Sequence, residues 1–531
     1  MKSMKEGTTK MKSMKKLVTL LFSLVMLCAL AIPVMAAEPT YSITINGAKG
    51  HEYTAYQVFK GVYSSDNDKE YLSDVEWGGN VDGENIINDL KASEILKNHF
   101  TIETKTAEQV ADILQGFSNN SAEMDEFARI VGKNLKADVA GKSSGVVEEQ
   151  NAKINDLTAG YYFVKDTGTI NDGEIATKFL VKVVGNADVT VKAQAPTLDK
   201  KIEKKDGSIV NGTSANVGDE ITFKLTANVP DMANFDTYTF TISDTLSKGL
   251  TFNKDSVEVK IGDTELIDNT NYTLGDLDTN TNTFTVTFTK EQLGDYVKHA
   301  DGAEIVVTYK ATLNSNALIV DKETNTAKLE YSNNPDGTGT GSTPEVPVYV
   351  YDFDLTVDKY DGTDETTTEK KLKDAVFVLY RLNGANKEYY KWNDVDKKVE
   401  WVTEKKNATP KTTDDQGKAS FKGIAAGSYF LEETKAPKGY NTLKDPVAVE
   451  IKATYKPDGT LNADADGFKL KQDATNNGHY YQLQSIANKA GALLPSTGGI
   501  GTTIFYVLGS IMALGAAVLL IAKKRLNGQD R

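Results

Sequence analysis

The sequence predicts a mainly β protein built from tandem antiparallel β-sandwiches, with a first domain that is α+β. Alternating apolar and polar residues, as in 221–225 and 283–288, recur between turns rich in Asn, Asp and Gly. Such period-two alternation is typical of strands with one buried face. Only the first third of the chain also carries apolar residues at helical spacing. Short helices are therefore expected in the first domain alone.

Two helices are expected there. The first has apolar residues at the i, i+3, i+4, i+7 spacing of a helix face, namely Val110, Ile113, Leu114 and Phe117. Thr106 and Gln109 give it a capping-box start. A similar apolar series after Asn120 suggests the second helix, namely Met124, Phe127, Ala128, Val131 and Leu135.

The N-terminus, residues 1–36, has the order of a secretory signal peptide. Lysines precede an apolar run over 17–32. Residues with small or medium-sized side chains then precede a predicted cleavage site before Ala37. The run is too short to cross a membrane comfortably. Cys28 raises the alternative of a lipoprotein signal, which the bulky Leu27 before it disfavours. We expect a secreted protein.

The C-terminus, residues 491–531, contains a pentapeptide, an apolar stretch and a basic cluster in that order. The pentapeptide is Leu494, Pro495, Ser496, Thr497 and Gly498. Residues 500–522 would extend roughly 34 Å as a helix, enough for a transmembrane segment, and the basic residues 523–525 would stay in the cytoplasm. A plain membrane anchor is the simpler reading. The three parts together resemble the LPXTG cell-wall sorting signal of Gram-positive surface proteins, which implies cleavage by sortase and anchoring to peptidoglycan.

Composition narrows the function classes. The formal net charge is −14, and removing both terminal signals takes away ten basic and two acidic residues, which leaves −22. So acidic a chain is a poor nucleic-acid binder. Its single cysteine, Cys28, would be lost with the signal peptide, so no disulfides are expected. Four histidines and the lack of a nucleophile-elbow, P-loop or zinc signature argue against an enzyme, including a secreted hydrolase with β accessory domains, and no cofactor is expected.

About 460 residues between the signals suffice for three domains. Breaks fall near Pro196 and just past the Gly- and Pro-rich run 333–347. The expected domains are residues 37–195, 196–350 and 351–490.

The third domain carries the clearest constellation. Residues 431–440 read Leu-Glu-Glu-Thr-Lys-Ala-Pro-Lys-Gly-Tyr. Alternation places Lys359 on the apolar face of a first strand with Leu355 and Val357, although burying an ammonium is costly unless it is paired or neutralised. Asn488 shares a face with Ile486 on a last strand.

These residues resemble the SpaA-like prealbumin (CnaB-type) domain of Gram-positive pilins, whose E-box 431–440 matches at every fixed position. The resemblance implies an internal isopeptide bond in which Lys359 is the nucleophile, Asn488 the acceptor and Glu433 the catalytic acid. Burial would lower the lysine pKa so that the neutral amine attacks, and first and last strands side by side would supply the proximity. The alternative is a buried Lys–Glu ion pair without a bond.

The second domain repeats this arrangement. Alternation turns Lys200 inward with Leu198 and Ile202 and leaves Lys201 in solvent.

Segments 240–250 and 325–331 resemble the isopeptide-forming second domain (D2, CnaA-type, immunoglobulin-like) of fimbrial proteins. That resemblance implies Lys200, Asp244 as acid and Asn325 as acceptor, whereas a simple turn carboxylate is the alternative for Asp244.

The first domain contains segments 53–61 and 157–162, which look like the N-terminal domain of backbone pilins. We identify no isopeptide triad in its sequence, and whether it forms such a bond stays open. In backbone pilins a lysine at the end of this domain, usually within Val-Tyr-Pro-Lys, attacks the thioester joining the next subunit to sortase. Lys192 holds that position, but Thr and Val stand in place of Tyr and Pro. Lys200 and Lys201 are the alternatives.

One acidic loop has the spacing of a calcium site, with Asn462, Asp464, Asp466, Gly467 and Asp473. Helices should flank such a loop, and β-type sequence does so here. A polar surface turn is the preferred reading, and no metal is expected.

The resemblance implies that the protein is the backbone subunit of a pilus (fimbria). Its expected partners are other copies of itself, sortases, peptidoglycan and minor or tip pilins. The main rival is a wall-anchored adhesin of stacked β domains, acting in cell adhesion, that does not polymerise.

Overall fold

The computed structural model describes residues 39–47, 49–66, 69–119, 121–148, 150–191, 195–230, 232, 235–294, 303–337, 339–363, 370–490 and 500–526. The predicted signal peptide, Lys192 and the pentapeptide 494–498 lie outside these residues. The chain separates into two compact units, one holding most of the chain up to Val191, the other the remainder with 118–129 and 169–177.

The first part of the chain is α+β. Its strands form the sheets β5-β1-β8 and β3-β2-β6-β7, with β4 paired to β2. The strands are β1 (Tyr41–Asn46), β2 (Glu52–Asp66), β3 (Lys69–Trp77), β4 (Lys142–Val146), β5 (Asn151–Leu157), β6 (Gly160–Asp166), β7 (Lys178–Val183) and β8 (Ala187–Thr190). The expected helices are present as α2 (Ala107–Leu114), with its capping box, and α3 (Ala122–Lys133). Sequence reasoning missed α1 (Gly83–Ala92), capped by Asp82.

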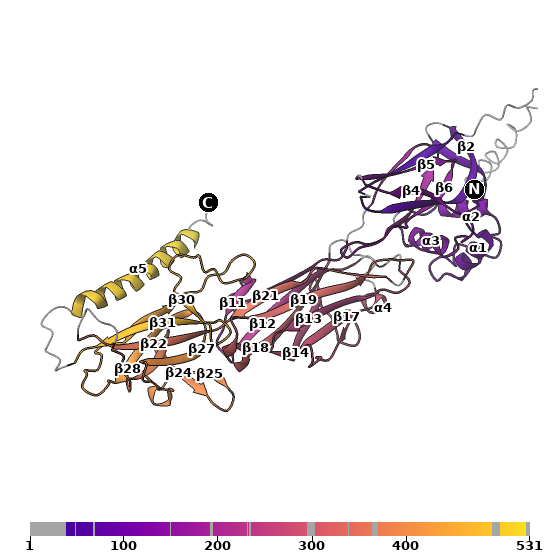
Figure 1. Ribbon diagram of the computed structural model, residues 1–531. Helices are drawn as coiled ribbons and strands as arrows, with labels where there is room; N and C mark the ends of the chain where they lie inside the picture. Colours follow the sequence, from indigo (N-terminus) through magenta and orange to yellow (C-terminus); the bar gives the residue numbers. More distant parts are fainter. Residues whose placement is uncertain are drawn as a thin grey trace, which may run out of the picture. The chain divides into compact units, whose positions relative to one another are not determined.

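The next strands form a second sandwich, β9 to β21, whose two sheets are visible in Figure 1. One sheet has the order β10-β9-β12-β18-β14-β15: β9 (Leu198–Glu203), β10 (Ile209–Val210), β12 (Glu220–Asn228), β14 (Leu250–Ile261), β15 (Thr264–Glu265) and β18 (Glu304–Leu313). The other has the order β11-β21-β19-β13-β17-β16, with β20 on β19: β11 (Gly212–Ser214), β13 (Phe240–Leu246), β16 (Thr273–Leu274), β17 (Thr283–Phe288), β19 (Glu323–Ser332), β20 (Thr340–Ser342) and β21 (Val346–Tyr351). Alternation buries one face of β12, β18 and β19, so the core lies between the sheets. Two short helices connect strands: α4 (Lys290–Leu293) and the 3₁₀ turn η2 (Ser315–Ile319).

A third sandwich follows, β22 to β31. Its smaller sheet has the order β27-β22-β31-β30: β22 (Phe353–Asp361), β27 (Lys418–Ile424), β30 (Leu470–Asp473) and β31 (His479–Asn488). The larger has the order β25-β24-β23-β28-β29, with β26 on β23: β23 (Val376–Asn383), β24 (Asn386–Asn393), β25 (Lys398–Val402), β26 (Lys411–Thr412), β28 (Gly427–Lys435) and β29 (Val447–Ile451), with the 3₁₀ turn η3 (Lys405–Asn407) between β25 and β26. The first strand, β22, pairs in parallel with the last, β31, beside it in Figure 1.

The second and third sandwiches are joined by specific hydrogen bonds. Three side chains between residues 476 and 479 each bond one of three successive carbonyls that follow β18. The pairs, all at 2.8 Å, are Asn476 with Leu318, Asn477 with Ile319, and His479 with Val320. Asn211 also donates to the carbonyl of Pro457 at 2.6 Å. These contacts fix the junction through backbone groups that solvent would otherwise bond.

A last helix, α5 (Ile500–Leu526), covers the predicted span 500–522. Among the described residues, no helix meets the length and apolarity required to cross a membrane. Some side chains of the predicted span lie outside the described part, and the span stays a prediction.

Candidate functional site

Lys359 lies in the interior of the third sandwich. On β22 it follows Leu355 and Val357 on the same face, and all three side chains are fully buried. Apolar side chains on this face would leave an ammonium without solvation, so it must find partners within the protein.

Those partners are Asn488 and Glu433. Nζ of Lys359 donates to Oδ1 of Asn488 and, at 3.2 Å, to the carbonyl of Ile486. It lies 3.7 Å from Oε1 of Glu433, on β28, where alternation turns Glu433 inward. Nδ2 of Asn488 donates to both oxygens of that carboxylate. The amine, carboxamide and carboxyl thus form one closed cluster.

Burial lowers the pKa of Lys359 to about 8, although the charge and hydrogen bonding of Glu433 oppose the shift. The amine therefore loses its proton much more easily than an ordinary lysine does, and only the neutral form has the lone pair required of a nucleophile.

The second sandwich contains a matching cluster. Lys200, Asp244 and Asn325 are all fully buried. Nζ of Lys200 donates to Oδ2 of Asp244 and, at 2.9 Å, to Oδ1 of Asn325. Burial lowers the pKa of Lys200 to about 8 against the charge of Asp244, and burial raises the pKa of Asp244.

The two clusters differ in topology. In the third sandwich the lysine and asparagine strands are neighbours, as expected. In the second, β9 and β19 belong to opposite sheets, so the expectation of side-by-side first and last strands is wrong there. Lys200 and Asn325 meet because both point into the space between the sheets, and β19 is followed by β20 and β21 in its own sheet.

Sequence reasoning missed one member of the second cluster, Tyr309. Its hydroxyl accepts hydrogen bonds from Nζ of Lys200 at 3.1 Å and from Nδ2 of Asn325 at 2.6 Å. The alternation of β18, with Ile305 and Val307 on the same buried face, was the available signal for an inward side chain. It indicates burial and does not identify the contacts.

The remaining predicted residues fall elsewhere. Lys201 is partly exposed and pairs with Asp199 at 2.7 Å. In the candidate calcium loop, the carbonyl of Asp466 accepts from the ammonium of Lys452 at 2.8 Å. Among the described residues, no group of three or more His, Cys, Asp or Glu side chains is arranged to hold a metal ion.

The sequence analysis also did not identify a buried histidine that lies beside two aspartates. At the junction of the sandwiches, Nε2 of His479 lies 3.4 Å from Asp354 and 3.7 Å from Asp352. Burial would lower the pKa of His479, but the neighbouring carboxylates of Asp354 and Asp352 outweigh this effect and raise that pKa to about 9. Burial raises the pKa of Asp352 to about 7; the charge of His479 opposes this shift, and Asp354 and Glu323 reinforce it.

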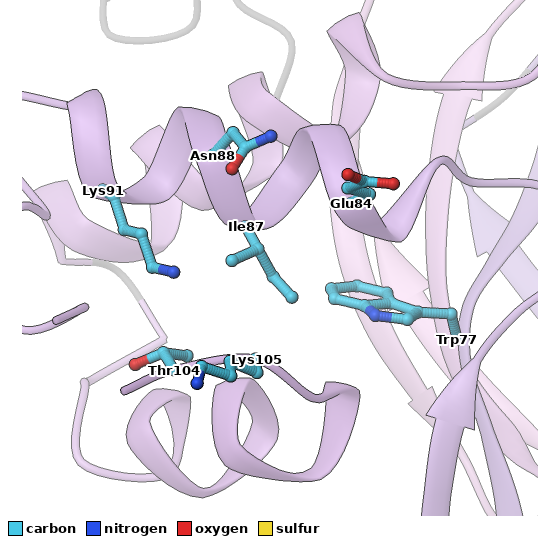
Figure 2. A pocket seen from close by; sticks show the side chains of 7 residues that line it. All are labelled: Trp77, Glu84, Ile87, Asn88, Lys91, Thr104 and Lys105. Atoms are coloured by element: carbon cyan, nitrogen blue, oxygen red, sulfur yellow. The ribbon is translucent and has the colours of Figure 1, made fainter. Parts of the chain in front are cut away.

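A cavity of about 430 Å³ lies in the first part of the chain. Figure 2 shows Glu84, Ile87, Asn88 and Lys91 along one helix, α1, with Trp77 at one end. Thr104 and Lys105 complete the lining.

Comparison with known proteins identifies three segments. Residues 217–335 match the family described as "Gram-positive pilin backbone subunit 2, Cna-B-like domain". Residues 354–466 match the SpaA "Prealbumin-like fold domain", and residues 487–525 match the "LPXTG cell wall anchor motif". The first two segments contain Asp244, Asn325, Lys359 and Glu433.

Two curated relatives match longer parts of the chain. The chain is 24% identical over 416 residues to the trypsin-resistant surface T6 protein of Streptococcus pyogenes serotype M6, covering 63% of this chain and 70% of that protein. It is 24% identical over 460 residues to fimbrial subunit type 2 of Actinomyces naeslundii, covering 79% of each. The solved T6 backbone pilin of S. pyogenes has a similar fold, with a TM-score of 0.51 at 18% identity, over 86% of this chain and 99% of that one.

The predicted mainly β fold, with short helices in the first domain, is confirmed. The chain belongs to the Gram-positive backbone pilins: it is a structural subunit, not an enzyme, with Cna-B-like and SpaA prealbumin-like domains, and it is a sortase substrate anchored through an LPXTG motif in a cell-surface pilus.

Proposed function

We propose that this backbone pilin forms the shaft of a covalent pilus by a specific pair of linkages. Thr497 becomes acyl-linked to the cysteine of a pilus sortase, and Lys192 of the next subunit then attacks that thioester. Repetition gives a fibre of identical subunits. A housekeeping sortase passes the last subunit to a peptidoglycan amine, and minor or tip pilins join the same fibre.

Within each subunit, we propose isopeptide bonds between Lys200 and Asn325 and between Lys359 and Asn488. The supporting observation is that each fully buried lysine amine contacts a carboxamide and lies beside a buried carboxyl. A buried ion pair alone is a weak source of stability, because desolvation offsets its Coulomb energy. A covalent bond removes the buried charges altogether.

In the third sandwich, Glu433 takes one proton from Lys359, and the neutral amine attacks Cγ of Asn488. The Nζ–Cγ bond forms as Cγ–Nδ2 breaks. Glu433 gives its proton to Nδ2, which leaves as ammonia, and takes a second proton from Nζ. The carboxyl contacts the leaving nitrogen and lies beside the amine, which is the geometry this shuttle requires.

The domain boundaries we propose are 37–195, 196–350 and 351–490. The sheets support them, since no sheet mixes strands from β1–β8, β9–β21 and β22–β31. The T6 backbone pilin, which is similar in fold, is described as having "a modular three-domain structure".

Intact mass of the purified mature protein tests the internal bonds. Two bonds predict a mass lower than that of the sequence by two molecules of ammonia, and tryptic digestion should yield the two cross-linked peptides. The unmodified mass would contradict both bonds and leave ion pairs in their place.

A denaturing gel of wall extracts tests the external linkage. A high-mass ladder that is lost in Lys192→Ala and kept in Lys201→Ala supports the proposed lysine. A ladder lost only in Lys201→Ala would move the linkage to that residue. A single wall-linked monomer in the wild type would support the non-polymerising adhesin.

A further inference from the structure

The two clusters handle the leaving nitrogen differently. In the third sandwich, Nδ2 of Asn488 donates to the carboxylate of Glu433. In the second, the described hydrogen bonds of Asn325 Nδ2 go to the hydroxyl of Tyr309 and not to Asp244. Of the two reacting groups, the amine of Lys200 and the amide of Asn325, Asp244 forms a described hydrogen bond only with the amine. Protonation of the leaving nitrogen of Asn325 therefore has to come from a residue other than Asp244.

Tyr309 is held firmly in that place. Its ring packs on Phe223, Phe284 and Phe252, with centroid separations of 5.4, 4.9 and 5.5 Å. The side chain is buried, and the ammonium of Lys200 lies 5.5 Å from its ring centroid. Burial also raises the pKa of the phenol well above its ordinary value, so the hydroxyl keeps its proton.

The chemistry requires a group in this position. An amide nitrogen is a poor leaving group until it is protonated, and its lone pair becomes available only when the attack on Cγ makes the centre tetrahedral. From that moment Nδ2 can accept a proton from the hydroxyl to which it donates in the starting state. Because the hydroxyl is already within hydrogen-bond distance of Nδ2, the transfer needs only a rotation of the O–H bond and no movement of the ring.

We propose that Tyr309 is a catalytic residue of the second sandwich, relaying a proton from the attacking amine of Lys200 to the departing nitrogen of Asn325. The inference rests on the proposed Lys200–Asn325 bond. It assigns to a tyrosine and an aspartate together the work that Glu433 does alone in the third sandwich.

The proton balance closes within the cluster. Asp244 first takes one proton from the ammonium of Lys200 and remains a neutral carboxyl. The amine attacks Cγ of Asn325, and the Nζ–Cγ bond forms. Tyr309 gives its hydroxyl proton to Nδ2 and receives one from Nζ as Cγ–Nδ2 breaks. Ammonia leaves, and the phenol ends in its starting form.

The test compares Tyr309→Phe with Tyr331→Phe in the full mature chain. Tyr309→Phe removes only the hydroxyl, and Tyr331, on β19, is a buried tyrosine whose hydroxyl contacts the carbonyl of Glu174 instead of the site. Intact mass is followed from the first purified sample over several days. General acid–base catalysis contributes about 10²–10⁴-fold to a rate, so bond formation in Tyr309→Phe should slow by at least roughly a hundredfold.

The third-sandwich bond serves as an internal control. The inference is supported if the wild type and Tyr331→Phe lack two ammonia molecules while Tyr309→Phe lacks one, with only the Lys359–Asn488 peptide cross-linked. Two ammonia molecules lost from Tyr309→Phe at the wild-type rate would overturn it and leave the proposed bond intact. A wild type without the Lys200–Asn325 peptide would instead refute the proposed bond, and the inference with it.

A second measurement separates proton transfer from packing. Fluorotyrosines at position 309 keep the ring and its hydroxyl but make the phenol more acidic. A rate of bond formation that changes with phenol acidity supports the relay. A rate that is the same for all of them contradicts it, even if Tyr309→Phe should fold poorly.

Discussion

The side-chain amide of Asn488 donates hydrogen bonds to both carboxylate oxygens of Glu433, at 3.0 and 3.2 Å. One of those oxygens, Oε2, also accepts from the backbone N–H of Leu443 at 2.8 Å, which fixes the orientation of the carboxylate. Because Oε1 lies 3.7 Å from Nζ of Lys359, one group reaches both the attacking and the departing nitrogen.

Glu433→Gln should abolish the third-sandwich bond, because an amide neither accepts the lysine proton nor returns one. We expect the mass deficit to fall from two ammonia molecules to one. Glu432→Gln is the matched control, since the adjacent Glu432 is directed away from the core and pairs with Lys405 at 2.7 Å. A full deficit in Glu433→Gln would show that the carboxyl is dispensable.

Lys359→Met should cost stability mainly through the lost covalent tie, because methionine fills similar space without a charge. The tie would close a loop of 129 residues. If disulfide loop entropy applies, its loss lowers the free energy of unfolding by roughly 5 kcal/mol. Calorimetry of the mature protein should show a lower unfolding temperature, and an unchanged one would argue that the native protein carries no tie here.

The junction histidine predicts a pH dependence. The pKa of His479 rises from 6.5 to about 9 on folding, so the folded protein holds this proton more tightly than the unfolded chain. Its stabilisation is complete below about pH 6.5 and is lost as the pH rises through about 9. The shift corresponds to about 3 kcal/mol. Unfolding temperatures of the wild type and His479→Gln should therefore differ by several degrees at pH 6 and converge above pH 9.

Asp352 predicts a second pH dependence, which the same unfolding measurements can test. Its pKa rises from 3.8 to about 7 on folding, so the folded state holds this proton as well. The wild type should lose stability relative to Asp352→Asn as the pH rises from about 4 to 7. A constant difference between the two proteins over this range would contradict the assignment.

Gly459→Ala should loosen the junction of the second and third sandwiches. Gly459 has φ +87°, and a Cβ there would lie 2.2 Å from the carbonyl oxygen of Asn211. Gly384→Ala is the control, because Gly384 has φ +59° with no atom within 4 Å of the added Cβ. The left-handed backbone costs both variants about 1–2 kcal/mol, and the clash adds about 1–3 kcal/mol to Gly459→Ala alone. Limited proteolysis should cut Gly459→Ala faster between the sandwiches, whereas equal rates would show that the junction yields easily.

Features that depend on neighbouring residues in the sequence could be predicted, and features that depend on contacts between distant strands could not. Period-two alternation is local, so it placed Lys359 with Leu355 and Val357 before any partner was known. The capping box at Thr106 is equally local, and α2 begins where it predicts. The short helix α1 has only Ile86, Ile87 and Leu90 as buried residues, too few for a helical period to stand out.

Features that depend on several strands were out of reach. Tyr309 acquires its contacts only when β9, β18 and β19 converge from two sheets, and alternation says nothing about which inward side chains meet. The same holds for His479, whose charged neighbours lie in the short segment from β21 into β22, far from it in sequence.

The positions of the two proposed bonds decide which part of a subunit would lengthen under tension. With both bonds formed, tension passes from Lys200 to Asn325 through the first isopeptide bond. It then acts along the chain to Lys359 and passes to Asn488 through the second bond. Everything between each bonded pair is bypassed, so only residues 325–359 could be drawn out between the two bonds, by at most roughly 120 Å. That stretch comprises β19, β20, β21 and most of β22, so the tension between the two bonds would act on strands of both sandwiches and on the junction where Asn211 and His479 make their contacts.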